Sequence, residues 1–206
     1  KTAVVAYRAD RTVPVRLSYR ELDARAARIA ASLKAMGVGH ADVVSFQLPN
    51  WWEFIALSLA CARLGAVANP VMPIFRQREL KFMLDFGDAK VLVVPKLYKG
   101  FDHEAMAREL LPQLTCTPKL VVVDGTGPDS FEQALLGSNA PALPAEPALT
   151  ADDVLLLMYT SGTTGEPKGV MHTSNTLFAN LHAFIQAYAL GDKDVILGAS
   201  PMAHLT

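Results

Sequence analysis

The sequence is poor in cysteine and carries almost no net charge. Its 206 residues include two cysteines, Cys61 and Cys116, and the formal net charge is −1 at pH 7. The cysteines lack metal-binding spacing, and Cys61 lies in an apolar helical stretch, as a small core residue would. Because there is no long basic run, we expect neither nucleic-acid binding nor an electrostatic membrane anchor. The scarcity of cysteine favours a reducing compartment and predicts a cytoplasmic location.

Long hydrophobic runs are also missing. The longest apolar stretch, residues 54–71, is interrupted by Arg63 and Pro70, which makes it a poor membrane span. We find no signal peptide and no internal repeat. The chain begins with Lys1 and stops at Thr206 just after an apolar run. We therefore expect both ends to be cuts in a longer protein.

The sequence does contain many apolar residues, arranged in alternating short and long segments. Hydrophobic residues make up 51% of the chain and charged residues 19%, which suits a buried α/β core. Two alternating runs within residues 3–17 predict a hairpin, and short apolar runs predict strands at 43–48, 66–69, 90–94, 120–123, 154–158, 169–172 and 195–199. Helical spacing predicts helices, caps included, at 18–36, 50–64, 76–86, 103–111, 130–136 and 174–188. This alternation predicts a mostly parallel sheet flanked by helices.

Several helix starts carry capping residues. Ser18 with Glu21 three positions later forms a capping box, and Asn50 with Glu53 is expected to cap the second helix in the same way. Ser174 is expected to cap the last helix.

Residues 160–169 combine groups suited to a polyphosphate. They supply four hydroxyls, three glycines and one lysine directly after a buried strand. Glycine lets backbone come close to a ligand, exposed N–H groups and hydroxyls donate to phosphate oxygens, and lysine adds a point charge. These groups together predict a loop that holds a polyphosphate such as a triphosphate or pyrophosphate.

Two other interpretations of this segment fit the sequence less well. A polar turn between strands is the simpler one, but the lysine and the turn-locking Pro167 disfavour it. The loop of kinases and GTPases has the pattern G-x-x-x-x-G-K-[ST]. Here Lys168 follows Pro167, and Gly169 stands where the Mg²⁺-binding hydroxyl belongs. The continuation is also strand-like, so no helix dipole would face the phosphates.

The segment 159–172, YTSGTTGEPKGVMH, resembles the phosphate-loop signature of the adenylate-forming superfamily. That group includes acyl- and aryl-CoA synthetases, luciferases and peptide-synthetase adenylation domains. Residues 17–22 (LSYREL), 60–70 (ACARLGAVANP) and 201–206 (PMAHLT) resemble further blocks of the same family, in family order. The resemblance covers essentially the whole chain and implies part of the large N-terminal domain of such an enzyme.

The resemblance implies a two-step reaction. A carboxylate attacks the α-phosphorus of ATP, giving an acyl-adenylate and pyrophosphate, and a thiol, usually of coenzyme A, then displaces AMP. The resemblance implies that the loop is an ATP-phosphate loop that contacts the β- and γ-phosphates, and that Mg²⁺ bridges phosphate oxygens. Its binding residues would be Thr160, Ser161, Gly162, Thr163, Thr164, Gly165 and Lys168. His204 would line the acyl pocket; the alternative is a histidine without a role at a strand end. His40, His103 and His182 are expected on surfaces or helix faces, and His172 is expected to be structural.

The family's other functional groups are not found in this sequence. These are a Mg²⁺-binding glutamate, a ribose-binding aspartate, a hinge and a C-terminal catalytic lysine. We therefore assign no catalytic residue and no metal ligand to the 206 residues, and expect them to be inactive alone. The oligomeric state is left open.

The resemblance and the composition together predict four parts. Residues 1–17 form a hairpin that belongs to a second subdomain, and residues 18–123 form the first α/β subdomain. Residues 124–153 form a Pro/Ala-rich connection. Residues 154–206 hold the phosphate loop and the incomplete start of the second α/β subdomain.

The substrate acid is only weakly indicated. Residues 44–54 and 69–75 look most like bacterial cyclohexanecarboxylate and medium-chain fatty acyl-CoA ligases, which would place the protein in fatty acid metabolism. Two alternatives stay open: an adenylation domain that loads a carrier protein, and a catalytically inactive nucleotide-binding module.

Overall fold

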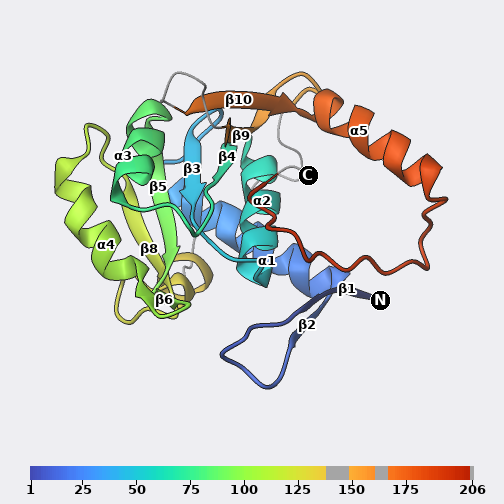
Figure 1. Ribbon diagram of the computed structural model, residues 1–206, viewed down its shortest axis with the longest axis horizontal. Helices are drawn as coiled ribbons and strands as arrows, with labels where there is room; N and C mark the ends of the chain where they lie inside the picture. The colour runs from blue at the N-terminus through green and yellow to red at the C-terminus, as the bar shows by residue number, and fades with distance from the viewer. Residues whose placement is uncertain (138–148, 161–166, 205–206) are drawn as a thin grey trace.

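The computed structural model describes residues 1–137, 149–160 and 167–204. Its centre is a six-stranded sheet (Figure 1) in the order β10-β9-β4-β3-β5-β8. The strands are β3 (Val43–Phe46), β4 (Val67–Pro70), β5 (Ala89–Pro95), β8 (Lys119–Val123), β9 (Val154–Thr160) and β10 (Lys168–Thr173). All neighbours pair in parallel except β9 and β10, which form an antiparallel hairpin. The predicted α/β fold with a mostly parallel sheet is confirmed.

Helices cover both faces of this sheet (Figure 1). They are α1 (Tyr19–Ala35), α2 (Trp52–Leu64), α3 (Gln77–Phe86), α4 (His103–Leu110) and α5 (Ser174–Ala187), with a 3₁₀ turn η1 (Leu111–Gln113) and a π-helical turn η2 (Glu132–Leu136). Two small antiparallel pairs complete the structure: β1 (Thr2–Ala6) with β2 (Val15–Ser18), and β6 (Leu97–Tyr98) with β7 (Phe101–Asp102). None of the helices within the described ranges is long and apolar enough to cross a membrane.

Two hydrophobic clusters hold the layers together, one on each face. Helices α1 and α2 pack on one face through side chains such as Ile29, Leu33 and Leu57, all fully buried. Helices α3 and α4 pack on the other face, where Leu80 and Leu110 are almost completely enclosed. Burying each such side chain contributes roughly 1.5–3 kcal/mol. The alternation of side chains along each strand therefore decides which helix layer a residue contacts.

The helix ends follow the sequence only in part. The Ser18–Glu21 capping box is confirmed: the Glu21 N–H donates to Ser18 Oγ at 3.2 Å, and the Ser18 N–H donates to Glu21 Oε2 at 2.7 Å. The predicted cap at Asn50 is wrong, because α2 begins after Trp51 with no side-chain cap and the Asn50 amide bonds elsewhere. Helix α5 is capped by Thr173, one residue before the predicted Ser174.

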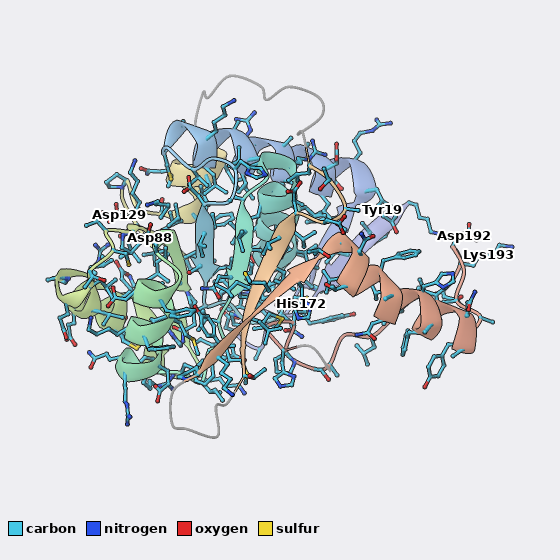
Figure 2. All side chains as sticks on the ribbon, turned by 90° about the horizontal axis from the view of Figure 1, so that it is seen from above. Tyr19, Asp88, Asp129, His172, Asp192 and Lys193 are labelled. Carbon is cyan, nitrogen blue, oxygen red and sulfur yellow. The ribbon has the colours of Figure 1, made fainter. Side chains whose placement is uncertain are left out.

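The predicted strand at 195–199 is also wrong. These residues have no regular secondary structure, and Val195 and Leu197 are 94% and 86% exposed. A strand needs a neighbouring strand for its backbone hydrogen bonds, and none of the described residues pairs with this segment. Figure 1 shows it as a red coil returning from the end of α5 toward α2. Helix α5 itself leads away from the sheet, and Asp192 and Lys193 lie beyond its far end (Figure 2).

Strand pairing places β9 and β10 in the same sheet as β3, β4, β5 and β8. The contact is narrow, since Ala68 and Leu156 are the paired residues between β4 and β9. The division of the chain into two subdomains, with the 1–17 hairpin assigned to the second, stays a prediction.

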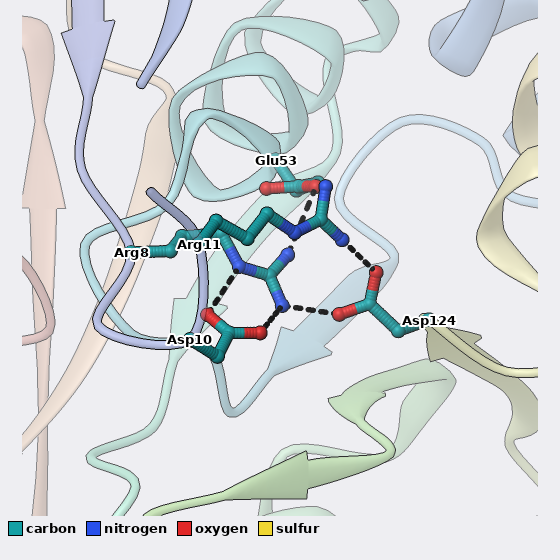
Figure 3. Close-up of polar contacts among 5 residues, drawn as sticks. All are labelled: Arg8, Asp10, Arg11, Glu53 and Asp124. Atoms are coloured by element: carbon teal, nitrogen blue, oxygen red, sulfur yellow. Dashed lines mark hydrogen bonds and ion pairs between the residues drawn. The ribbon is translucent and has the colours of Figure 1, made fainter. Parts of the chain in front are cut away.

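A cluster of charged residues, of which Arg8 and Glu53 are buried, connects the loop after β1 to the helical layer (Figure 3). The Arg8 guanidinium donates to the carboxylates of Asp10 and Asp124, and Arg11 Nη2 donates to Asp124 Oδ1 at 2.7 Å. Glu53, in the first turn of α2, lies 4.0 Å from Arg8 Nη1 and is 3% exposed. One Glu53 oxygen and Arg8 Nη1 have no hydrogen-bond partner. Burial therefore raises the pKa of Glu53 from 4.5 to about 7.

Glu53 should make stability depend on pH. A carboxyl whose pKa is higher in the folded chain keeps its proton where the unfolded chain has lost it, so folding weakens as the pH rises. The free energy of unfolding should fall between about pH 4.5 and pH 7. The loss should be complete above that range, at about 3 kcal/mol for a pKa change of this size. Glu53→Gln should remove this dependence and stabilise the protein at pH 8, measured by denaturant unfolding across pH.

Glu132 offers a matched control. It lines the same surface pocket beside α1 as Glu53 does, but it is exposed. Glu132→Gln should leave the pH profile unchanged. Parallel profiles for wild type and Glu53→Gln would contradict the assignment of the buried charge.

Candidate functional site

The hairpin of β9 and β10 carries the predicted phosphate loop. Thr160, the last residue of β9, pairs directly with Lys168, the first residue of β10. Both side chains are exposed. The predicted loop residues Ser161, Gly162, Thr163, Thr164 and Gly165 lie outside the described residues. The structure thus brings together the two ends of the predicted binding loop, one hydroxyl and one ammonium, at the mouth of the hairpin.

The hairpin presents its two faces to different layers. Directly opposed residues on antiparallel strands share a face, and the next pair along lies on the opposite face. Tyr159 pairs with Gly169, and the Tyr159 ring packs against the cluster of α3 and α4. Thr160 and Lys168 therefore lie on the other face, the one shared with Leu156, which packs against the cluster of α1 and α2.

Tyr159 anchors the base of the hairpin to α3. Its hydroxyl donates to the carbonyl oxygen of Met83 at 2.9 Å, and its ring lies edge-on to Phe82 and Phe86 at centroid distances of 6.5 and 6.3 Å. Burial raises the pKa of Tyr159 to about 12, so the hydroxyl stays a donor. Sequence reasoning missed this residue because its partner carbonyl lies 76 positions earlier.

Two glycines leave room for this anchor. A Cβ added at Gly169 would lie 3.2 Å from both Leu157 Cδ1 and Phe86 Cε1, closer than most real contacts. A Cβ at Gly87, after the end of α3, would lie 3.5 Å from the Tyr159 hydroxyl. The glycine that follows Lys168 thus allows β10 to approach α3 closely, a packing reason for its place in the motif.

His204, the predicted acyl-pocket residue, lies in a turn on the α1–α2 side. Its side chain is exposed, and its backbone N–H donates to the carbonyl of Pro201 at 3.0 Å. The preceding residue, Ala203, is 7% exposed. It belongs to the hydrophobic cluster against which Leu156 also packs. His204 therefore follows directly on a residue of the cluster that Leu156 also contacts. No hydrogen bond between described side chains joins His204 to Thr160 or Lys168.

His103 was expected on a surface or a helix face. It is the first residue of α4, but it lies on the buried face of that helix: it is 1% exposed, and its Nδ1 lies 3.2 Å from Gln47 Oε1. Burial lowers the pKa of His103 to about 4, so the ring is neutral near pH 7. The Gln47 amide also donates to the carbonyls of Met72 and Phe75 at 3.0 Å. This network holds the loop before α3. It joins three segments that are far apart in the sequence, so no local pattern predicts it.

The family model for AMP-binding enzymes, described as "AMP-binding enzyme", matches residues 1–206. The chain belongs to this family. The match extends over the whole sequence, so membership rests on more than the phosphate-loop motif. The adenylate-forming resemblance is thereby confirmed.

Curated relatives of this AMP-binding chain include ligases of aromatic and of fatty acids. It is 37% identical over 200 residues to the 2-hydroxy-7-methoxy-5-methyl-1-naphthoate–CoA ligase of Streptomyces carzinostaticus, covering 93% of this chain and 36% of that protein. It is 34% identical over 191 residues to the medium-chain fatty-acid–CoA ligase of Escherichia coli strain K12, covering 92% and 34%. The chain thus spans about a third of the length of these relatives.

Solved structures agree with this membership. The crystal structure of ATP-bound MatB from Rhodopseudomonas palustris matches with a TM-score of 0.76 and 29% identity, covering 93% of this chain and 36% of that chain. The likeness runs over nearly all of the AMP-binding chain described above.

The Tyr159 anchor can be tested by removing one atom. Tyr159→Phe should lower the free energy of unfolding by roughly 1–2 kcal/mol, because the ring stays packed while the buried Met83 carbonyl loses a donor. Chemical denaturation measures the change. Tyr188→Phe, at a 67% exposed tyrosine, should change stability by less than about 0.5 kcal/mol. Equal effects of the two substitutions would show that the hydroxyl does not anchor the hairpin.

Proposed function

We propose that the protein activates a carboxylic acid with ATP, forming an acyl-adenylate and pyrophosphate, and then transfers the acyl group to coenzyme A. The observation that carries this is the pairing of Thr160 with Lys168 across the mouth of the β9–β10 hairpin. The whole-chain family match supports it. Activity, substrates and partners are proposed for the complete gene product that contains these residues.

The chain's part in this reaction is to hold the triphosphate. The Thr160 hydroxyl can donate to a phosphate oxygen, and Lys168 supplies a positive charge on the same face of the hairpin. We propose that Ser161, Gly162, Thr163, Thr164 and Gly165 complete the cradle with hydroxyl and backbone donors. Donors fixed in advance stabilise charge that develops as pyrophosphate leaves, because they need no reorganisation during the reaction. The Tyr159 anchor supplies that rigidity from the opposite face.

The proposed reaction consists of two displacement steps. A carboxylate oxygen forms a bond to the α-phosphorus while the bond to pyrophosphate breaks, and the coenzyme A thiolate then displaces AMP from the acyl carbon. Mg²⁺ is proposed as the counter-ion of the phosphates. Within the described ranges, no three His, Cys, Asp or Glu side chains gather into a metal site, so we assign it no ligand in this chain.

We propose His204 as part of the acyl pocket; the packing of its neighbour Ala203 in the cluster that Leu156 contacts supports this. The acids to test first are medium-chain fatty and aromatic acids, given the relatives named above, and cyclohexanecarboxylic acid, given the resemblance of residues 44–54 and 69–75. A cytoplasmic location is proposed from the low cysteine content.

Replacing Lys168 tests the phosphate site. Lys168→Ala in the complete gene product should raise the KM for ATP or lower kcat/KM about 10- to 100-fold, the loss expected for one charged hydrogen bond. Stability should stay unchanged, since the side chain is exposed. Acid-dependent pyrophosphate release measures the rate. Lys193→Ala, at an exposed lysine beyond α5 (Figure 2), is the control and should behave as wild type. Unchanged kinetics of Lys168→Ala would remove Lys168 from the site.

A further inference from the structure

Asn50 joins two segments that lie 150 residues apart. Its Nδ2 donates to the carbonyl oxygens of Ser200 at 2.7 Å and Gly198 at 3.2 Å. Its Oδ1 accepts from the backbone N–H of Met202 at 2.9 Å. Both donors and the acceptor of the amide are therefore used on one short stretch of backbone.

The stretch that Asn50 holds is the one that carries His204. Beyond Met202, Ala203 is buried against the cluster of α1 and α2, and Met202 packs against the same cluster. The His204 N–H then closes the turn on the Pro201 carbonyl. Just before this stretch, Leu197 is 86% exposed. Residues 198–201 are exposed as well, so the hydrogen bonds to Asn50 and the packing of Met202 and Ala203 are what hold this stretch.

The position of Asn50 is itself firmly set. It follows β3 and precedes Trp51, which is 5% exposed. The Arg8 guanidinium lies 3.5 Å over the Trp51 ring, and the Tyr98 ring meets it edge-on at 6.1 Å. Arg8 is tied in turn to Asp10 and Asp124 (Figure 3). The three hydrogen bonds of Asn50, which form the Asn50 clamp, therefore lie next to a buried tryptophan that packs against Arg8.

We propose that Asn50 is a positioning residue: through these three hydrogen bonds it fixes residues 198–204 and so sets the place of His204 for the substrate acid. This rests on the proposed function of His204. An aspartate would present a carboxylate to two carbonyl oxygens, and an alanine would leave all three groups without their partner. Only a side chain with donors and an acceptor at this length makes the whole set.

The kinetic test uses Asn50→Ala and Asn50→Asp in the complete gene product. Both should raise the KM for the carboxylic acid about tenfold or more and leave the KM for ATP within twofold, because the clamp acts on the acyl side. Asn175→Ala removes an exposed asparagine that bonds to Asp152, and should leave both constants unchanged. A loss confined to thermal stability, with both KM values intact, would overturn the proposal.

A double-mutant cycle tests whether Asn50 acts through His204. If it does, Asn50→Ala combined with His204→Ala should be no worse for the acid than His204→Ala alone, since the losses share one cause. Multiplying losses would overturn the proposal, and so would an unchanged acid KM in Asn50→Ala when His204→Ala raises it.

Hydrogen exchange at the Met202 amide separates failure of the clamp from failure of the proposed function. Exchange should be at least tenfold faster in Asn50→Ala than in wild type, whether or not the protein is an active ligase. Unchanged exchange would overturn the clamp. If exchange is faster but His204→Ala does not change the KM for the carboxylic acid, the acyl-pocket role of His204 is rejected. The positioning role of Asn50 is then rejected with it.

Discussion

The candidate site depends on one buried contact, the hydroxyl of Tyr159 on the carbonyl of Met83. Strands β9 and β10 form the edge of the sheet, and Ala68 and Leu156 are the paired residues between β4 and β9. Leu157 and Met158 of β9 are buried as well. Tyr159, whose ring lies edge-on to Phe82 and Phe86, adds a hydrogen-bonded connection between the hairpin and α3. Since Thr160 is the next residue, the orientation of the loop's first hydroxyl follows from this contact.

Strand alternation turns this anchor into a site. With Tyr159 and Gly169 directed to the α3 layer, the next pair, Thr160 and Lys168, has to lie on the opposite face. That face belongs to α1 and α2, where residues 198–204 return and dock. One face of the hairpin therefore packs against α3, and the other face carries the residues proposed to bind phosphate. The glycine at position 169 allows the packing against α3, because a side chain there would crowd Leu157 and Phe86.

Local features of the fold could be predicted from the sequence because local patterns encode them. The Ser18–Glu21 capping box, the end of α2 at Gly65 and the buried strands follow from residues close together in the chain. Asn50 was wrongly predicted as a helix cap because its true partners lie 150 residues away. Residues 195–199 have the composition of a strand, but composition cannot supply a neighbouring strand. Both errors have the same origin: whether a segment finds a partner depends on residues far away in the sequence.

The same limit applies to the site. The loop motif was visible in the sequence because its hydroxyls, glycines and lysine are consecutive, and the family match agrees with it. Three contacts join segments that are distant in the sequence, so no local spacing predicts them: the Tyr159 anchor, the Gln47–His103 network and the Asn50 clamp. The residues that would bind substrate are thus easier to predict than the residues that hold them in place.

The central claim is that the β9–β10 hairpin serves adenylate formation. The most direct measurement is exchange of labelled pyrophosphate into ATP by the complete gene product, with and without a carboxylic acid. Reversible adenylate formation predicts label in ATP only when both the acid and Mg²⁺ are present, and addition of coenzyme A should then release AMP. Formation of ADP, or absence of exchange with every fatty, alicyclic and aromatic acid, would contradict the account.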